Sequence, residues 1–414
     1  MRRAIQGAAT ALLLLMAAGN AEAAAPPQIE QGFRQFLERE IWPEAKAAGV
    51  SRAVFDRALG KVHPNLDLPD LVLPGETAPV EEVNRQAEFS SPAGYFDEKR
   101  MATTVTRGRA LLRTHAQLLA RIERQTGVPG PIVVAIWGRE SGYGTAKIPY
   151  DAFEVLGTKA YLARRKAMFR EELIAALRIV EDGDLSVADM RSSWAGALGQ
   201  PQFMPTKFRQ LARDGDGDGR RDIWNSVPDT LLSIAAYLKD AGWVANRPWG
   251  FEARVPASVS CTIEGPDRMR PVADLARAGL TRISGQPFPA SEARQPGTLL
   301  MPAGRFGPAF VATPNFYTIK SYNNSDLYAL FIGHLADRIA GSEGAFQTPW
   351  TAPKGLTRGE VSRLQQRLEA KGMDVGGTDG LAGFKTRRSL GAAEEAASRP
   401  ATCWPTRETV RIAG

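Results

Sequence analysis

The sequence predicts a mainly α-helical protein with a small β-rich insertion and a separate small helical unit at its C-terminal end. Three observations lead to this prediction. Apolar residues recur at helical spacing through much of residues 24–340. Within that range, about 246–313 contains short alternating runs broken by Pro and Gly, which are typical of strands and turns. Residues 341–354 have the composition of a linker, and helical spacing returns over 355–414.

Residues 1–23 have the pattern of a secretory signal peptide. Arg2 and Arg3 form a charged start, residues 11–18 an apolar centre, and residues 21–23 a small-residue cleavage site. No cysteine follows the apolar run, so a lipid anchor is not expected. No later stretch reaches the length of a membrane-spanning helix. We therefore expect an exported protein, periplasmic in a cell with an outer membrane, and without a membrane span.

The composition is that of an ordinary globular chain. Hydrophobic residues make up 43% and charged residues 23% of its 414 residues, which argues against disorder and allows two or more domains. The formal net charge of +7 suits a protein that acts on a polyanionic polymer, although a charge balance with no partner fits equally well. Lys and Arg do not cluster with aromatic residues, so nucleic acid is not an expected partner.

The cysteines and histidines limit the available chemistry. Cys261 and Cys403 are the two cysteines of the chain, and export permits a disulfide bond between them. They fall in different predicted units, so the sequence favours two unpaired cysteines. His63, His115 and His334 lie far apart without ligand spacing, which argues against a zinc site.

Amphipathic patterns predict several further helices, and we assign their apolar stripes to the hydrophobic core. The predicted ranges are about 99–126, 159–182, 227–241 and 326–340. In the C-terminal unit, an amphipathic helix carries Leu356, Val361, Leu364 and Leu368, and a second helix covers 384–390.

One predicted helix, over 130–141, is apolar on nearly every side. Pro131 fits its first turn, where the missing N–H has no consequence, and Gly142 marks its end. A helix without a polar face is usually buried in a core. Glu140 lies in the last turn on the same face as Trp137, so its carboxyl group points into apolar surroundings.

This position predicts a raised pKa for the Glu140 carboxyl group. Burial disfavours the charged form, and the negative end of the helix dipole acts in the same direction. A carboxylic acid that stays protonated near neutral pH serves as a general acid that protonates a leaving oxygen. The alternative is a glutamate at a frayed helix end, solvated or paired with arginine, and this stretch alone favours neither reading.

Residues 192–205 contain too many small and turn-forming residues for a plain helix. Glycines there permit close approach of a ligand to the backbone. Ser193, Gln200 and Gln202 offer hydrogen bonds to a sugar, and Phe203 offers a stacking face. A tight turn between helices explains the same pattern, and taken alone it is the favoured interpretation.

Residues 214–225 fit a calcium-binding loop. Oxygen ligands stand at positions one, three, five and nine, and Gly219 stands at position six. Arg220 offers its backbone carbonyl at position seven. Asn225 replaces the usual glutamate at position twelve, and Asp229 just beyond supplies an acidic alternative. We expect a structural rather than a catalytic ion, because the loop leaves no open ligand position.

At this point the chain resembles a known family, the lytic murein transglycosylases of the membrane-bound lytic transglycosylase B type, over about residues 30–340. The resemblance rests on Ile136-Trp137-Gly138-Arg139-Glu140-Ser141, on the run from Ser193 to Pro205, on the acidic loop with Asp222-Ile223-Trp224, and on Ser321-Tyr322-Asn323-Asn324. Residues 355–391 resemble the small helical peptidoglycan-binding module often appended to this domain, through Leu364-Gln365 with Leu368, Asp379-Gly380 and Thr386-Arg387.

The resemblance implies a lysozyme-like fold with a small β-rich subdomain, and cleavage of the β-1,4 bond between N-acetylmuramic acid and N-acetylglucosamine. It places the catalytic glutamate at Glu140. It places the glycan groove at Ser193, Gln202, Phe203, Tyr237, Tyr322, Asn323 and Tyr328. The implied calcium ligands are Asp214, Asp216, Asp218, the Arg220 carbonyl and Asp229. We expect no organic cofactor, a monomer, peptidoglycan strands as partner, and contacts with cell-wall synthesis proteins as a further option.

The implied mechanism uses one carboxyl group and releases a 1,6-anhydro sugar without water, whereas ordinary glycosidases use two carboxyl groups. Two alternatives stay open. A hydrolytic muramidase would use the same groove with water as the attacking group. A non-catalytic murein-binding protein gives no reason to bury an acid at Glu140.

Overall fold

The computed structural model describes residues 25–76, 92–342, 344–353 and 356–413. The predicted signal peptide, residues 1–23, lies outside this part. Within the described residues, helices dominate and a small sheet is inserted late in the chain, so the predicted fold class is confirmed. None of the described helices has the length and apolar character needed to cross a membrane.

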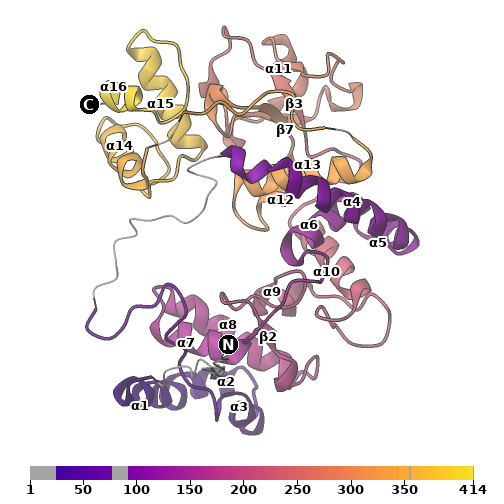
Figure 1. Ribbon diagram of the computed structural model, residues 1–414, viewed down its shortest axis with the longest axis vertical. Helices are drawn as coiled ribbons and strands as arrows, with labels where there is room; N and C mark the ends of the chain where they lie inside the picture. Colours follow the sequence, from indigo (N-terminus) through magenta and orange to yellow (C-terminus); the bar gives the residue numbers. More distant parts are fainter. Residues whose placement is uncertain (1–24, 77–91, 343, 354–355, 414) are drawn as a thin grey trace, which may run out of the picture.

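One helical lobe is assembled from two separate stretches of the chain, and it lies at the bottom of Figure 1. Its helices are α1 (Pro27–Phe36), α2 (Trp42–Ala47), α3 (Arg52–Leu59), α7 (Ala152–Leu162), α8 (Lys166–Glu181) and α9 (Pro205–Leu211). They share one core in which Phe33, Phe55, Phe153 and Phe208 are almost fully buried. The loop over 192–205 leads into α9 and joins this lobe to the next.

A second group of helices surrounds the apolar helix predicted over 130–141. It consists of α4 (Glu98–Thr114), α5 (Ala116–Thr126), α6 (Gly130–Ser141), α10 (Val227–Asp240), α12 (Pro314–Lys320) and α13 (Asp326–Ala340). Helix α6 contacts α4, α5, α10 and α13, and its residues from Ile132 to Gly138 are all buried. This wrapping on every side explains why α6 has no polar face.

The β-rich part is a five-stranded sheet with the order β4-β6-β7-β3-β5. Its antiparallel strands are β3 (Gly250–Arg254), β4 (Arg270–Pro271), β5 (Thr281–Arg282), β6 (Pro296–Leu300) and β7 (Ala309–Ala312). The short helix α11 (Val272–Arg277) follows β4. Strand β7 is buried along its whole length, because β3 and β6 pair with its two edges and its side chains pack alternately into two hydrophobic cores, one on each face of the sheet. A separate two-stranded pair joins β1 (Tyr150–Asp151) to β2 (Arg191–Ser192).

The C-terminal unit contains α14 (Arg358–Ala370), α15 (Phe384–Ala396) and α16 (Arg407–Ala413), and it lies beside the sheet (Figure 1). A disulfide bond joins Cys403 to Cys261 in the β-rich part. The preference for unpaired cysteines is therefore wrong. Sequence separation hides the contact, because the chain after α15 turns back onto the short helical turn at 261–263.

The segment 341–353 has no regular structure among its described residues, but it packs firmly against the protein. The Trp350 ring stacks on Phe96, with ring centroids 5.2 Å apart. The Phe346 ring lies 4.1 Å from that of His334 in α13. The backbone N–H groups of Gln347 and Thr348 donate to the Glu252 carboxylate. These contacts connect α13 and the sheet through a segment whose composition reads as a linker.

Two predicted helices are divided in the structure. The range 99–126 forms α4 and α5, with a break at His115. The range 159–182 forms the end of α7 and then α8, because Ala163 is extended and pairs with Leu71 from a distant segment. Helix α16 has no counterpart in the sequence-based prediction. In these places tertiary contacts override the helical pattern of the local sequence.

Asp337 near the end of α13 predicts a pH-dependent stability. The residue is exposed as a whole, but its Oδ2 accepts a 2.9 Å hydrogen bond from Trp249 Nε1, and desolvation of the carboxyl group raises the pKa of Asp337 from its ordinary 3.8 to about 6. The folded state thus holds a proton between pH 4 and 6 that the unfolded chain releases. The resulting stabilisation is complete below pH 4 and is lost as the pH rises through 6.

We therefore expect the free energy of unfolding of the natural chain to fall, relative to that of Asp337→Asn, by about 1 kcal/mol between pH 4 and pH 7, because solvent around this exposed residue screens most of the shift. Urea denaturation of both proteins across this range measures the difference. A difference that does not change with pH would contradict a raised pKa of Asp337.

Candidate active site

Glu140 stands in the last turn of α6, where the helix meets a turn. Pro131 occupies the first turn of α6, and Gly142 ends the helix in the left-handed conformation with φ +56°. Glu140 is partly buried and Arg139 beside it is exposed, whereas Ile132 to Gly138 are all buried. The last turn of α6 thus holds one partly buried carboxyl group at the boundary of the core.

The Tyr328 hydroxyl donates a hydrogen bond of 2.6 Å to Glu140 Oε1. Burial raises the pKa of Glu140, while the hydrogen bond from Tyr328 and the positive charge of Arg139 oppose that rise. Tyr328 and Tyr322 themselves stay protonated, because burial and the neighbouring Glu140 raise the pKa of both phenols. A carboxyl group with a raised pKa beside neutral donors has the properties of a general acid.

Four aromatic side chains from three separate segments meet beside Glu140. The Tyr322 ring stacks on Tyr328, with an interplanar angle of 13°, and its centroid lies 4.6 Å from that of Tyr237. The ring centroid of Phe203 lies 5.8 Å from that of Tyr237 and 6.0 Å from that of Tyr322. This cluster joins α10, α13 and the turn 321–324 to the loop over 192–205, and it contains four of the predicted groove residues.

Hydrogen bonds fix the cluster to the backbone. The Tyr322 hydroxyl donates to the Pro201 carbonyl at 2.8 Å, and the Tyr237 hydroxyl donates to the Ser321 carbonyl at 2.7 Å. Tyr328 and Phe203 are almost fully buried. They therefore support the site from behind, whereas Tyr237 and Tyr322 stay partly exposed.

The loop over 192–205 is held by side chains that the sequence interpretation offered to a sugar. Gln200 Oε1 accepts a 2.6 Å hydrogen bond from Trp137 Nε1, and Gln200 Nε2 donates to the Trp224 carbonyl. The Gln202 side chain donates to the Gly199 carbonyl, and Ser193 Oγ accepts from the Ala197 N–H. Gln200 is thus a structural link between α6 and this loop.

A cavity of about 530 Å³ lies beside the last turn of α6. Gly138 and Arg139, which precede Glu140, and Asn323, which follows Tyr322, line it, whereas Glu140 itself is not a lining residue. Tyr95, in the segment that leads into α4, and Arg100, in the first turn of α4, also line it. The Arg139 guanidinium donates to the Tyr95 hydroxyl at 2.9 Å and lies over the Tyr95 ring. Nothing in the sequence indicates Tyr95 and Arg100, because only the fold brings their segment to this cavity.

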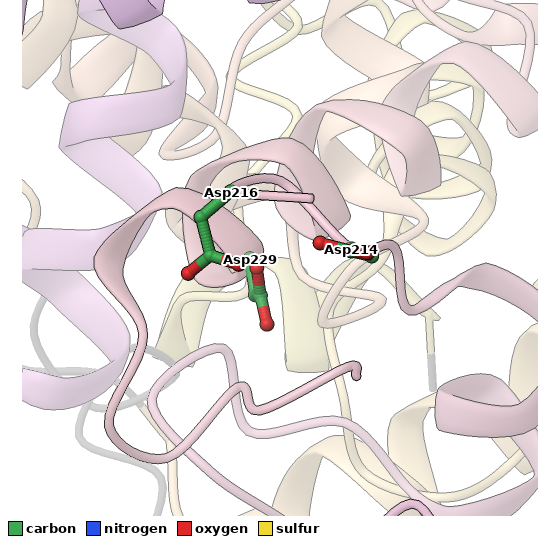
Figure 2. Close-up of side chains that lie close together, drawn as sticks. All are labelled: Asp214, Asp216 and Asp229. Carbon is green, nitrogen blue, oxygen red and sulfur yellow. The ribbon is translucent and has the colours of Figure 1, made fainter. Parts of the chain in front are cut away.

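Three of the predicted calcium ligands come together at the start of α10. Asp214, Asp216 and Asp229 each offer a carboxylate oxygen, and these oxygens lie within 4.8 Å of one another (Figure 2). Asp218 is not part of this cluster, and its carboxylate accepts from the Arg220 N–H.

Asp229 is buried at the centre of the acidic loop. Its two oxygens accept from the Gly215 and Asp222 N–H groups at 2.7 Å each. Burial raises the pKa of Asp229, whereas backbone hydrogen bonds from Gly217 and Gly219 lower that of Asp214. Carboxylates gathered in this way offer the oxygen donors that a hard cation such as Ca²⁺ prefers. The cluster lies at the N-terminal end of the helix that also carries Tyr237.

Comparisons with known proteins agree with this geometry. The family model described as "Transglycosylase SLT domain" matches residues 32–337. Membrane-bound lytic murein transglycosylase B of Escherichia coli is 31% identical over 239 residues, which span 57% of this chain and 64% of that protein. The match to this curated relative thus leaves about a third of its length uncovered.

Solved structures extend the likeness to nearly the whole chain. SltB3 from Pseudomonas aeruginosa, in complex with NAG-NAM-pentapeptide, aligns with a TM-score of 0.79 and 35% identity, covering 92% of this chain and 99% of that one. A second SltB3 structure contains NAG-anhNAM-pentapeptide, with a TM-score of 0.78 and 36% identity over the same shares of the two chains. The Escherichia coli lytic transglycosylase Slt35 in complex with calcium shares the fold at a TM-score of 0.52 and 24% identity, over 76% of this chain and 93% of its own. The predicted lysozyme-like fold is thereby confirmed.

The geometry predicts how Tyr328 tunes the acid. Its hydrogen bond stabilises the ionised carboxylate, so Tyr328→Phe is expected to raise the pKa of Glu140 further. Titration of the ¹³C-labelled glutamate carboxyl signals by NMR measures the change. Tyr237→Phe is the matched control, since the Tyr237 hydroxyl bonds to the Ser321 carbonyl and not to Glu140. Equal Glu140 pKa values in the natural chain and Tyr328→Phe would contradict this assignment.

Proposed function

Because the chain belongs to the transglycosylase SLT domain family, we propose that it is a lytic murein transglycosylase. It cleaves the β-1,4 bond between N-acetylmuramic acid and N-acetylglucosamine in peptidoglycan and leaves a 1,6-anhydro-N-acetylmuramic acid end. The observation that carries this proposal is the placement of Glu140, a partly buried carboxyl group with a raised pKa that accepts a hydrogen bond from Tyr328, in the motif that the family uses. The role in the cell is turnover and remodelling of the wall.

The first step is the departure of the N-acetylglucosamine unit. Glu140 gives its proton to the glycosidic oxygen, and the bond between that oxygen and the anomeric carbon of N-acetylmuramic acid breaks. The leaving unit departs with a free 4-hydroxyl group. The acetamido oxygen of the substrate stabilises the positive charge on the anomeric carbon. The carboxylate left on Glu140 is held by the Tyr328 hydroxyl and the charge of Arg139.

The second step closes the anhydro ring. Glu140, now ionised, takes the proton of the C6 hydroxyl group, whose oxygen bonds to the anomeric carbon. The carboxyl group returns to its protonated state and no water is consumed. An attacking hydroxyl within the same sugar has a high effective concentration, which favours it over water.

The electrostatic surroundings of Glu140 in the described part of the chain favour this route over hydrolysis. Hydrolytic glycosidases place two carboxyl groups about 5–10 Å apart. In the described part of the chain, the influences on the pKa of Glu140 are burial, Tyr328 and Arg139, and no carboxylate is among them. That SltB3 binds NAG-anhNAM-pentapeptide, an anhydro form, favours the same route by analogy.

Tyr237, Tyr322 and Asn323 are proposed to contact the sugar chain, together with Ser193 and Gln202 of the loop. Tyr237 and Tyr322 belong to the aromatic cluster that includes Tyr328, and Asn323 lines the cavity. Phe203 and Tyr328 are proposed to hold these residues in position. We propose that the C-terminal unit binds peptidoglycan, and that the protein acts outside the cytoplasm, in the periplasm, as a monomer without organic cofactor.

We also propose a structural Ca²⁺ ion bound by Asp214, Asp216 and Asp229. The buried Asp229 and the mutual approach of three carboxylates support a cation, because close negative charges repel each other without one. When bound, the ion would tie the loop to the start of α10, the helix that carries Tyr237. It takes no part in the bond-breaking steps.

Replacement of the acid tests the function. Glu140→Gln is expected to abolish release of muropeptides from murein sacculi, because an amide cannot donate the proton. Mass spectrometry of the products measures release, and the natural chain is expected to give products lighter by one water than hydrolytic ones. The control is Glu172→Gln, a buried glutamate of raised pKa that binds Thr206 away from the aromatic cluster.

Hydrated reducing ends would replace the proposal by a hydrolytic muramidase. A folded natural chain that releases nothing would favour the murein-binding alternative. Release at the natural rate by Glu140→Gln would remove Glu140 from the chemistry altogether.

Removal of calcium tests the proposed ion. Calcium at a hundredfold excess over its Kd is expected to stabilise the fold by about 2.7 kcal/mol, seen as a higher Tm than in chelator. Asp216→Asn should weaken this shift, whereas Asp218→Asn, an equally exposed aspartate outside the cluster, should largely retain it. A Tm that is the same with calcium and with chelator would exclude a structural ion.

A further inference from the structure

Arg387 in α15 carries a buried positive charge from the C-terminal unit into the rest of the protein. Its side chain is only 4% exposed. Its guanidinium donates to both oxygens of Glu264, from Nε at 3.0 Å and from Nη2 at 2.5 Å. Nη1 donates to the Ala382 carbonyl at 2.8 Å. Such a bidentate pair has a fixed geometry that a lysine cannot reproduce.

The same guanidinium also reaches the helix that bears Tyr328. Nη2 lies 3.3 Å from Oδ2 of Asp326, the first residue of α13. The other oxygen of Asp326 accepts from Lys320 Nζ at 2.8 Å, and Lys320 is the last residue of α12. Asp326 therefore links the C-terminal unit to both ends of the turn 321–325.

This turn and the first turn of α13 carry the groups that meet Glu140. Tyr322 lies in the turn, and Tyr328 follows Asp326 by two residues. Ser325 Oγ caps α13 by accepting the Tyr328 N–H at 3.1 Å. A shift of Asp326 would move Tyr328 with it and change the 2.6 Å hydrogen bond to Glu140. The path from Arg387 to Glu140 thus runs through one ion pair, less than one helical turn and one hydrogen bond.

We propose that Arg387 is a positioning residue for the active site, so that the C-terminal unit sets the geometry of Tyr328 and Glu140 in addition to any binding of its own. This inference rests on the proposed function for its catalytic readout. Without Arg387, the negative charges of Glu264 and Asp326 would lose their shared positive partner. The first turn of α13 would then shift from its present position.

Arg388 is a matched control on the same helix. It also joins α15 to the β-rich part, through bonds of 2.7 and 2.8 Å to the two oxygens of Asp267, and its side chain is 10% exposed. Among the described residues, it forms no hydrogen bond or ion pair with α13, unlike its neighbour Arg387. Substitution of either arginine therefore weakens the attachment of the C-terminal unit, but only Arg387→Met disturbs the support of Tyr328.

The experiment compares Arg387→Met, Arg387→Lys, Arg388→Met and Tyr328→Phe in the full chain. With murein as substrate, Arg387→Met is expected to lower kcat by about 10-fold to 100-fold with a smaller change in KM, because small displacements of catalytic groups have effects of this size. Loss of the Tyr328 hydrogen bond raises the pKa of Glu140, so the alkaline limb of the pH profile should move to higher pH, as in Tyr328→Phe. Arg387→Lys should restore part of kcat, and Arg388→Met should leave both readouts near those of the natural chain.

Several results would overturn the inference. Equal kcat values and equal pH limits for Arg387→Met and Arg388→Met would make Arg387 a structural anchor only. If Arg387→Met does not fold, the pair Asp326→Asn and Asp267→Asn replaces the arginine pair, with the same expected contrast. If the natural chain cleaves no murein, the proposed function fails. NMR titration of Glu140 in the same variants then decides the positioning role, because it needs no turnover.

Discussion

The hydrogen bond from Tyr328 to Glu140 joins two buried helices that meet only in the folded protein. Helix α6 supplies an acid whose burial favours the protonated form, and α13 supplies a hydroxyl that favours the ionised form. The balance between these two opposing influences lets one carboxyl group both give and take a proton. Neighbouring parts of the site help to fix the distance between the Tyr328 hydroxyl and the Glu140 carboxyl group. They are the aromatic cluster of Phe203, Tyr237 and Tyr322, the turn 321–325 and the loop over 192–205.

Helix α13 connects this site to the rest of the protein. Its first turn carries Asp326 and Tyr328 and meets α15 of the C-terminal unit. Its last turns carry His334 and Asp337, which meet Phe346 and Trp249 beside the sheet. The β-rich insertion and the C-terminal unit therefore both act on the helix that completes the active site. This arrangement gives a physical reason for a catalytic domain and an appended unit to be packed together rather than tethered.

The local sequence was sufficient to predict those features that depend only on residues close together in the chain. The all-round apolar character of α6 indicates its burial, and the position of Glu140 in its last turn indicates a raised pKa. The spacing of Asp214 and Asp216 with Asp229 beyond them indicates an acidic cluster.

Contacts between distant segments could not be predicted from the local sequence. Residue types alone do not show that Gln200 bonds to Trp137 or that Cys261 pairs with Cys403. The extended Ala163, which ends α7, depends on Leu71 more than ninety positions away in sequence. The partner of Glu140 followed only from the family resemblance, as one of several residues near the groove.

The most direct test of the account compares two quantities in the natural chain: the pKa of Glu140 from NMR titration of its ¹³C-labelled carboxyl group, and the pH at which kcat/KM for murein falls on the alkaline side. If one protonated glutamate starts the reaction, both values should lie above the ordinary pKa of glutamate, and they should agree. A Glu140 that titrates at the ordinary value, with cleavage continuing undiminished at higher pH, would contradict the claim that a buried, protonated Glu140 is the catalytic acid.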